Sequence, residues 1–390
     1  MTEFVLTPVD IILLTVLAVT FLLIQVYNLR YYRQILANNQ KSRKGSLAYT
    51  DQLPPLSIIL SAHDEAHHLQ ELLPLLLKQD YPKFEVIVIN DASTDNTEEV
   101  LKTFEAKYPN LYHSFTPSTA RYISRKKLSL TLGIKASKYD WLVFTELDCR
   151  PSGDQWLRTL ARNFTDDTDI VLGYSGYAHH KGFQLANLSF NNLLLSARYL
   201  CMALAGRPYM GCGRNLAYRK ELFYRNHGFS QQLNLKRGED DLFINQAATS
   251  KNTRVETSSQ ATMRIEPHTL RQHMTVRNDY HASARYFKGN QRAIWSFETG
   301  IQFFFLLYIM AGLLVSLLTH QWILAGIFAF IWLLKTTIQI ALFRRTARTL
   351  GEQHSYLLQS LFAYSWLMFE IVLVRSYCLI KGEREFRRNQ

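Results

Sequence analysis

The sequence predicts an α/β domain with a mostly parallel sheet, flanked by helices that cross a membrane. Long apolar blocks lie near both ends of the 390-residue chain. In residues 55–290 between them, short apolar runs alternate with segments of helical periodicity, the pattern of strands and helices in a parallel sheet. With 47% hydrophobic and 19% charged residues, the composition excludes a disordered chain.

The first apolar block covers residues 9–27, and Asp10 is its only charged residue. A membrane-spanning helix needs about 20 predominantly apolar residues. Because no basic segment precedes the block and no small-x-small cleavage site follows it, we expect a transmembrane helix in residues 1–30 and not a signal peptide. Residues 31–54 form a basic linker. Positive residues favour the cytoplasmic side, so the domain after the linker is predicted to be cytoplasmic.

Two further apolar blocks predict a transmembrane hairpin over residues 301–343, and the basic loop 344–348 places its end in the cytoplasm. A fourth block, 357–374, contains Glu370 and leads into a basic tail. We therefore expect residues 357–380 to form either a transmembrane or an interfacial helix, and favour the interface. The net charge of +12 is compatible with nucleic acid or with an anionic leaflet. Since the basic residues cluster beside the apolar blocks, we expect a membrane and no nucleic acid as partner.

Polar clusters follow each of three predicted strands. The strands are Leu56–Leu60, Phe84–Ile89 and Trp141–Thr145, and the helices between and after them are His67–Lys78, Thr97–Tyr108 and Lys127–Ser137. The clusters are Ser61–Glu65, Asn90–Asp95 and Glu146–Asp148. Ligands of parallel α/β sheets bind at the carboxyl ends of the strands, so these clusters predict a ligand site there.

Two of the clusters predict specific contacts. In the second, Thr94 and Asp95 are candidates for helix capping, whereas Asp91 stands at the strand end and could accept hydrogen bonds from a nucleobase. In the third, Glu146 and Asp148 are one residue apart on an extended chain and point the same way. Both can reach one divalent ion that also binds a diphosphate, although this short motif is common by chance.

Two more segments have competing interpretations. Gly211–Arg219 contains two glycines that allow close backbone approach, or that form an ordinary turn before a strand. Gly238–Leu242 contains three consecutive acids, which either complement the dipole of a helix or include a general base.

Taken in order, these motifs resemble glycosyltransferase family 2, the inverting group with the GT-A fold, over about residues 55–290. Ser61–Glu65 is similar to its first strand end, and Asn90–Asp95 resembles its D-D-x-S-x-D element with Asn90 in place of the first acid. The remaining matches are Lys126–Thr131 to K-x-x-A-L-N, Glu146–Asp148 to D-x-D, Gly211–Arg219 to G-x-G-x-N-x-A-Y-R, and Glu239-Asp240 to E-D.

The resemblance implies Asp240 as the catalytic base and Asp148 as the ligand of Mg2+ or Mn2+. It implies that the nucleotide-sugar is bound by Ala62, Glu65, Asp91, Lys126, Glu146, Asp148, Gly213, Asn215 and Glu239. Interfacial helices are expected near 268–290. The family's processive members carry Q-x-x-R-W there, and Val276–Tyr280 lacks all three residues, which favours transfer of a single sugar.

The predicted function is inverting transfer from a nucleotide-sugar donor, with UDP favoured, to a lipid or saccharide acceptor in cell-surface polysaccharide or glycolipid synthesis. The predicted location is the inner (plasma) membrane, with several spans and a cytoplasmic catalytic domain. Two alternatives stay open: transfer to a polyprenyl phosphate, whose acceptor is already anionic, and a non-catalytic membrane scaffold that retains a nucleotide-sugar fold.

Overall fold

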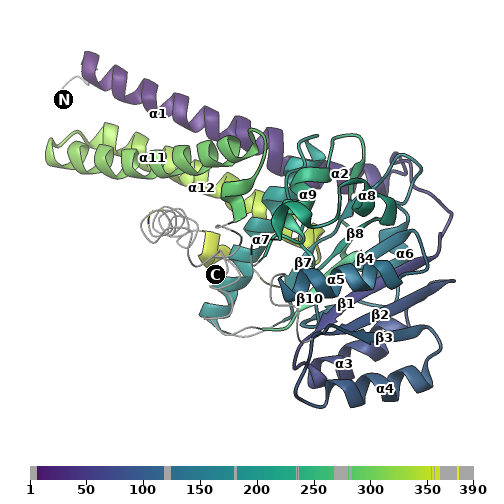
Figure 1. Cartoon of the computed structure of the whole chain (residues 1–390). Coiled ribbons are helices and arrows are strands. Elements are labelled where there is room, and N and C mark those ends of the chain that lie inside the picture. The colour runs from purple at the N-terminus through teal and green to yellow at the C-terminus, as the bar shows by residue number, and fades with distance from the viewer. Residues whose placement is uncertain are drawn as a thin grey trace.

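A bundle of long helices projects from a compact α/β domain (Figure 1). This computed structural model describes residues 7–117, 124–179, 182–233, 235, 237–267, 280, 283–352, 354, 356–360 and 376. The α/β domain is built mainly from residues 56–265, and the bundle from the helices before and after it. The α/β domain thus lies between helices that precede and follow it in the chain.

The main sheet has seven strands in the order β3-β2-β1-β4-β8-β6-β9. Their bounds are β1 Leu56–Ala62, β2 Phe84–Asn90, β3 Leu111–Phe115, β4 Trp141–Phe144, β6 Ile170–Leu172, β8 Leu216–Arg219 and β9 Thr253–Val255. Strands β3, β2, β1 and β4 are parallel, whereas β8 is antiparallel to both β4 and β6. The expected mostly parallel sheet is confirmed, and one strand of opposite direction enters it at β8.

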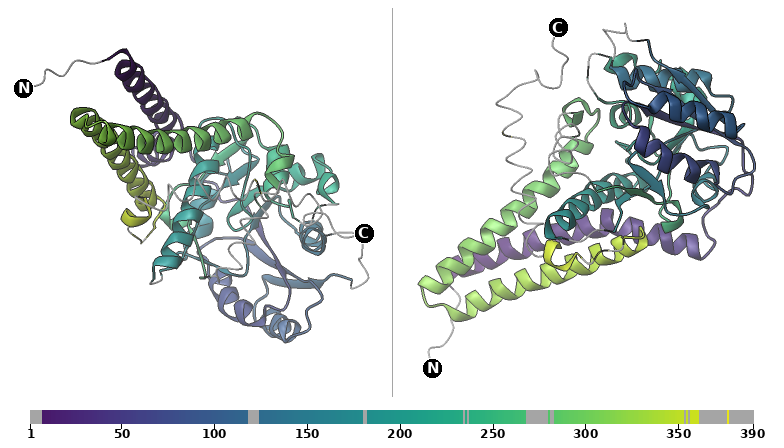
Figure 2. Two further views of the ribbon diagram at one scale, coloured as in Figure 1. Left: turned by 90° about the vertical axis from the view of Figure 1, so that its left-hand side faces the viewer. Right: turned by 90° about the horizontal axis from the view of Figure 1, so that it is seen from below.

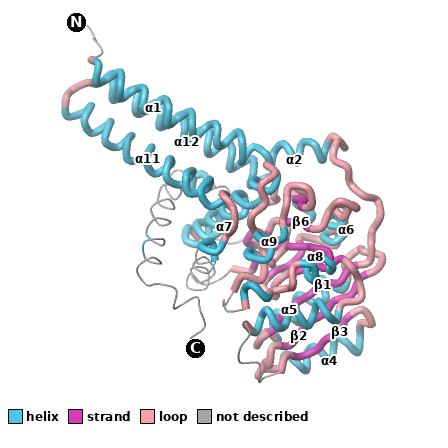
Figure 3. The backbone as a smooth tube through the Cα atoms, turned by 45° about the horizontal axis from the view of Figure 1, so that its top comes forward, coloured by secondary structure: helices cyan, strands magenta, loops and turns pink. Residues whose placement is uncertain are grey.

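Helices cover both faces of the first half of the sheet (Figure 3). These are α3 Ala66–Leu77, α4 Thr97–Lys107 and α5 Arg125–Ala136. Ile58 and Leu60 of β1 share a core with α3 and α4, whereas Ile59 shares one with α5. Alternate strand residues face opposite sides, so one short apolar run supplies both cores. Burying each such side chain is worth about 1.5–3 kcal/mol.

A second, three-stranded sheet has the order β5-β10-β7. Its strands are β5 Cys149–Pro151, β7 Ser175–Tyr177 and β10 Met263–Ile265, so β5 begins directly after Asp148. The other helices of the domain are α6 Trp156–Ala161, α7 Phe183–Leu204, α8 Lys220–Arg225 and α9 Asp241–Ala247, with 3-10 turns at Ser230–Gln232, Ser259–Ala261 and Ala284–Tyr286.

Within the part of the chain that the structure describes, three helices are long and apolar enough to cross a membrane. Helix α1, Pro8–Tyr27, continues through a π-helical turn, Asn28–Tyr32, into α2, Arg33–Arg43. Helices α11, Gln291–Leu318, and α12, Trp322–Thr349, form a hairpin beside α1, and the N-terminal end of α1 lies at the tip far from the α/β domain (Figure 2). Most of the fourth predicted block, like 268–279 of the expected interfacial region, lies outside the described residues.

Buried polar contacts fasten the bundle to the α/β domain. Arg198 of α7 pairs with Glu298 of α11 at 2.5 Å, and both side chains are buried. Beyond α12, the carboxylate of Glu352 is buried and accepts hydrogen bonds from the hydroxyls of Tyr174 and Tyr356, each at 2.6 Å. Breaking such buried networks leaves unpaired groups, which is costly, so these contacts fix how the domain sits on the helices.

Candidate active site

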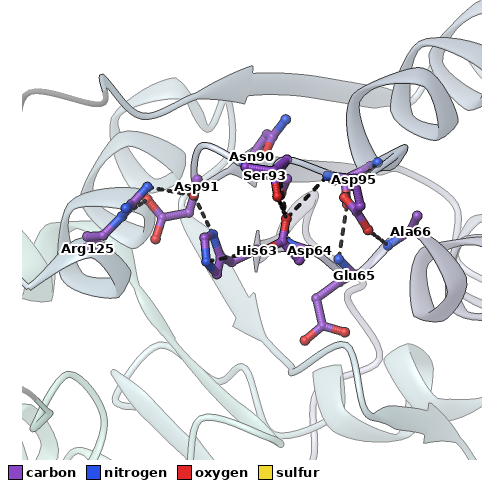
Figure 4. Close-up of polar contacts among 11 residues, drawn as sticks. His63, Asp64, Glu65, Ala66, Asn90, Asp91, Ser93, Asp95 and Arg125 are labelled. Atoms are coloured by element: carbon purple, nitrogen blue, oxygen red, sulfur yellow. Dashed lines mark hydrogen bonds and ion pairs between the residues drawn. The ribbon is translucent and has the colours of Figure 1, made fainter.

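The loops after β1 and β2 interlock at the carboxyl edge of the sheet (Figure 4). The Oδ1 atom of Asp64 accepts the backbone N–H of Thr94 at 2.6 Å, and Ser93 Oγ accepts the N–H of Asp64 at 3.0 Å. Asp95 Oδ2 accepts the N–H of Ala66 at 3.1 Å. The hydrogen bond from the Thr94 backbone is the main cause that lowers the pKa of Asp64. The two loops thus form one preformed unit.

Asp91 lies at the centre of this unit and is buried. Its N–H donates to the carbonyl of Ala62 at 2.7 Å, so Ala62 holds the backbone of Asp91 in place. Its Oδ1 accepts Thr116 Oγ1 at 2.5 Å and Arg125 Nε at 3.2 Å. Among the described residues, Oδ2 of Asp91 has no hydrogen-bond partner, so one carboxylate oxygen remains to accept a donor from a ligand.

Glu65 points away from Asp91 (Figure 4). Its backbone N–H donates to Thr97 Oγ1 at 3.0 Å, and its carboxylate pairs with Nδ1 of His68. The other ring nitrogen of His68 lies 3.3 Å from Oε2 of Glu266. The structure therefore places Glu65 in a charged network at the rim of the site. Sequence reasoning missed Thr116 and Arg125; only the position of Arg125 beside Lys126 could have indicated it.

A pocket next to these loops collects five of the sequence-predicted residues. It lies beside β4, β8 and the start of α5, and is lined by Lys126, Leu130, Phe144, Thr145, Glu146, Gly213, Leu216, Tyr218, Glu239 and Asp240. The chain segments that meet here are far apart in sequence, and the register of β4 against β8 brings them together, with Phe144 opposite Leu216. The pocket combines an apolar floor with a charged rim.

Alternating charges form a ladder along the rim. Lys126 Nζ lies 3.3 Å from Glu239 Oε1 and 2.6 Å from Glu146 Oε1. Arg214 then bridges Glu146 and Asp148, with Nε 2.9 Å from Glu146 Oε2 and Nη2 3.2 Å from Asp148 Oδ2. Burial alone would raise the pKa of Glu146, but Lys126 and Arg214 bring it down to about 2.

The Glu146–Asp148 pair fits a cation that takes only part of its ligands from protein. Both acids reach one guanidinium, although the chain here is not extended as we expected: residues 146–149 form a turn, in which the N–H of Cys149 donates to the carbonyl of Glu146 at 3.1 Å. Within the described residues, no group of three or more His, Cys, Asp or Glu side chains could hold an ion. Mg2+-type sites often use one or two carboxylates plus phosphate oxygens of the substrate, and this donor set suits that arrangement.

The three consecutive acids point in three directions, and each has a different partner. Glu239 is buried against Lys126, and Asp241 is buried and accepts from Ser283 Oγ. Asp240 faces the pocket, where its Oδ2 accepts the N–H of Gly213 at 2.8 Å and the hydroxyl of Tyr280 at 3.0 Å. Burial, and then the charge of Glu239, raise the pKa of Asp240.

Asn215 lies in the core and not at the pocket. Its Oδ1 accepts Trp156 Nε1 at 3.2 Å, and its Nδ2 donates to the carbonyls of Tyr174 at 2.8 Å and Ala261 at 2.7 Å. These contacts tie the large sheet to the segment leading into β10. The G-x-G-x-N pattern thus contributes Gly213 to the pocket and Asn215 to its support.

Comparison with known proteins finds similarity to glycosyltransferases. Residues 57–226 match the family model described as Glycosyl transferase family 2. The chain is 31% identical over 150 residues to glycosyltransferase AglE of Haloferax volcanii, covering 37% of this chain and 47% of that protein. It is 30% identical over 97 residues to poly-beta-1,6-N-acetyl-D-glucosamine synthase of Staphylococcus epidermidis, covering 25% and 22%. The chain thus spans about half or less of the length of these relatives.

One solved structure shares the fold over nearly the whole chain. It is mannosyltransferase PcManGT from Pyrobaculum calidifontis, in complex with GDP-Man and Mn2+. The likeness covers 94% of this chain and 100% of that one, with a TM-score of 0.54 and 15% sequence identity. This likeness shows that the chain has the GT-A fold.

Proposed function

We propose that this chain, which matches the model of glycosyl transferase family 2 over residues 57–226 and has a GT-A fold, transfers one sugar from a nucleotide-sugar donor to a lipid or saccharide acceptor with inversion. The observation that carries the proposal is the place of Asp240. This half-buried carboxylate faces the same pocket as Lys126 and Glu146, where a donor diphosphate and an acceptor hydroxyl can meet.

The nucleotide half of the donor is assigned to the loop unit after β1 and β2. The open Oδ2 of Asp91 can accept an N–H of a nucleobase, and Arg125 lies beside it at the start of α5. Both uracil and guanine offer such a donor. UDP is our first choice, as in the sequence prediction, and the GDP-Man bound by the structural neighbour makes GDP the second.

The diphosphate half is assigned to the charged ladder. Lys126 and Arg214 carry the positive charges, and Glu146 with Asp148 would hold Mg2+ or Mn2+ together with phosphate oxygens. The ion would stabilise the charge on the departing nucleoside diphosphate. Mn2+ in the structural neighbour supports this assignment. Lys126 and Arg214 can exchange carboxylate for phosphate, because both are cations on movable side chains.

Asp240 is assigned the role of general base. Its carboxylate takes the proton of the acceptor hydroxyl while the oxygen attacks the anomeric carbon and the bond to the diphosphate breaks. The N–H of Gly213 and the hydroxyl of Tyr280 orient the carboxylate. A raised pKa makes Asp240 a stronger proton acceptor than an ordinary aspartate, provided that it is ionised at the working pH.

The three apolar helices support a location in the inner (plasma) membrane with a cytoplasmic α/β domain. Arg30 follows α1, and Arg344 and Arg345 lie near the end of α12, at the domain end of the bundle. Positive residues at that end favour the cytoplasmic side. Protease added to inverted vesicles should therefore cut the domain, and protease added to intact cells should leave it whole.

A donor screen with purified full-length protein tests the function. UDP-, GDP- and dTDP-sugars are incubated with Mg2+ or Mn2+, and released nucleotide and the anomeric configuration of the product are measured. One donor class should be consumed, with inversion. A wild-type protein that releases nucleotide from none of these donors would favour the scaffold alternative. Turnover only with polyprenyl phosphate would identify that acceptor.

A further inference from the structure

Lys127 is a lysine whose side chain is completely buried, on the helix that also carries Lys126. Its Nζ lies 2.7 Å from the carbonyl oxygens of Gln232 and Leu235 and 2.8 Å from that of Arg237. An ammonium group has three N–H donors and no acceptor, so each proton has one carbonyl partner. All three carbonyls belong to the segment that leads directly into Gly238–Asp240.

The two adjacent lysines contact this segment at different points. Successive residues of a helix are turned by about 100°, so Lys126 faces the pocket while Lys127 faces the backbone beside it. Lys126 pairs with Glu239, and Lys127 binds three backbone carbonyls, those of Gln232, Leu235 and Arg237. Helix α5 packs tightly against β1, because a Cβ at Gly133 would come within 2.6 Å of the Ile59 side chain.

Burial of this ammonium works against its charge. Removal from water lowers the pKa of Lys127 to about 8, although Glu239, Asp241 and Asp240 act to raise it. These are the charged groups that face it across the segment, and Lys126 is its neighbour on α5. Apolar residues often replace buried charges without loss of stability. The retained charge is better explained by what it holds than by a gain in folding energy.

We propose that Lys127 is a positioning residue for the sugar-transfer step, holding the carbonyls of Gln232, Leu235 and Arg237 so that Asp240 keeps its place beside the acceptor. The inference rests on the proposed function. A neutral amine has only two N–H donors, so deprotonation removes one of the three hydrogen bonds to these carbonyls and loosens the segment. The donor contacts at Asp91 and the Glu146–Asp148 pair lie on other elements and keep their geometry.

The test compares Lys127→Met with Lys135→Met, which removes an exposed lysine of the same helix. Measured are kcat, the Kd of the product nucleoside diphosphate and the melting temperature. Displacement of a catalytic group by about 1 Å can cost ~100-fold, so Lys127→Met should lose about 10- to 100-fold in kcat. Its nucleotide Kd should change by less than about threefold, and Lys135→Met should match wild type.

A pH profile supplies a readout that a merely structural role would not move. Wild-type kcat should fall as the pH rises through about 8, and Lys127→Met should lack this fall at its lower rate. Cys212 and Tyr280 contact each other near Asp240, but burial raises the pKa of Cys212 to about 11 and that of Tyr280 well above its usual value. Their titration therefore lies above this range.

Three results would overturn the inference: normal kcat in folded Lys127→Met, an unchanged alkaline fall in that variant, or parallel losses of kcat and nucleotide binding. If Lys127→Met does not fold, the same measurements are made on Lys127→Gln, and the pH profile of wild-type kcat is the second test. A wild-type kcat that stays flat from pH 7 to 9 counts against the proposal. An active wild type that is inactivated by Asp240→Asn but not by Lys127→Met would reject only this inference. A wild type inactive with every donor would reject the proposed function as well.

Discussion

The two halves of the candidate site hold their acids in different ways. Around Asp64 and Asp95, carboxylate oxygens accept mainly backbone N–H groups and hydroxyls of a neighbouring loop. Around Glu146, Asp148 and Glu239, the partners are the side-chain cations Lys126 and Arg214. Backbone donors are fixed by the fold, whereas a lysine or arginine can turn to a phosphate. The first half is therefore suited to a constant nucleotide, and the second to groups that change during a reaction.

A loss of several orders of magnitude in rate is expected at Asp240, where the second half would do its chemistry. Asp240→Asn keeps the shape of the side chain and one oxygen that can accept hydrogen bonds, but the amide cannot act as a base. A general base contributes ~10²–10⁴ in rate. We expect kcat to fall by about that factor, with donor Kd little changed.

Glu239→Gln and Asp241→Asn are the matched rivals of this variant. Both residues are buried against other partners, Lys126 and Ser283, and are expected to act on folding or donor binding. A larger kcat loss at either one would move the base there. Equal and small losses at all three acids would return the cluster to a helix-capping role and favour a polyprenyl-phosphate acceptor.

The next effect separates the two acids of the ladder. Asp148→Ala should abolish transfer and weaken Mn2+ binding in the presence of nucleoside diphosphate, whereas Glu146→Ala should be milder. The reason is that Asp148 is the acid of this pair that fits the D-x-D motif best, whereas Glu146 stands where the motif has an aspartate. Mn2+ binding followed by electron paramagnetic resonance measures this directly. Near-normal turnover in Asp148→Ala would show that the metal assignment is wrong.

The sequence predicted the parallel half of the fold well, because its signals are local. Buried strands such as Phe84–Asn90 read as apolar runs, and α3 and α4 begin and end within a residue of the prediction. It did not predict β3, whose side chains are mostly partly exposed, or the short strands β5, β7 and β9. Three-residue strands carry no periodicity, and their pairing depends on partners distant in sequence.

The candidate site was predictable where a residue type sits at a strand end and unpredictable where its side chain chooses among long-range partners. Glu146, Gly213, Glu239 and Asp240 come from three separate motifs and line one pocket. The motif gave Asn215 the same role, yet its amide serves three groups of the core. Conversely, nothing in the run Lys126-Lys127 distinguishes the pocket lysine from the buried one, since the difference lies in carbonyls more than 100 residues away.

Asn215 offers a way to separate support from binding. Asn215→Ala leaves the indole N–H of Trp156 and the carbonyl of Ala261 without the amide partner, whereas the carbonyl of Tyr174 keeps the N–H of Met263 at 3.1 Å. A buried group left unpaired costs about 1–3 kcal/mol, so we expect a loss of roughly 2–4 kcal/mol in the free energy of unfolding. Donor Kd in the folded protein should be unchanged. A large loss of donor affinity at constant stability would instead support the direct donor contact that the motif implied.

The smallest expected effect tests the preformed loop unit. Asn tolerates the left-handed backbone of residue 64, where φ is 56°, so Asp64→Asn weakens the contacts to Thr94 and Asp95 without adding strain. We expect the Kd of the nucleoside diphosphate to rise by about three- to tenfold, with kcat at saturating donor unchanged.

The pH dependence of Asp64→Asn provides its internal check. Because the hydrogen bond from Thr94 lowers the pKa of Asp64 in the folded state, the ionised side chain adds stability above the ordinary aspartate pKa of about 3.9. That contribution disappears as the pH falls through the folded-state pKa. The difference in melting temperature between wild type and Asp64→Asn should therefore be present at pH 7 and shrink toward pH 3.

Asp80→Asn is the control, since Asp80 is also exposed with a lowered pKa but pairs with Gln155 and Arg158 away from the loop unit. It should show the same narrowing of the stability difference and no change in nucleotide Kd. If Asp64→Asn also leaves the nucleotide Kd unchanged, the first half of the site does not depend on the interlocked loops, and the contrast between fixed and exchangeable partners fails at that point.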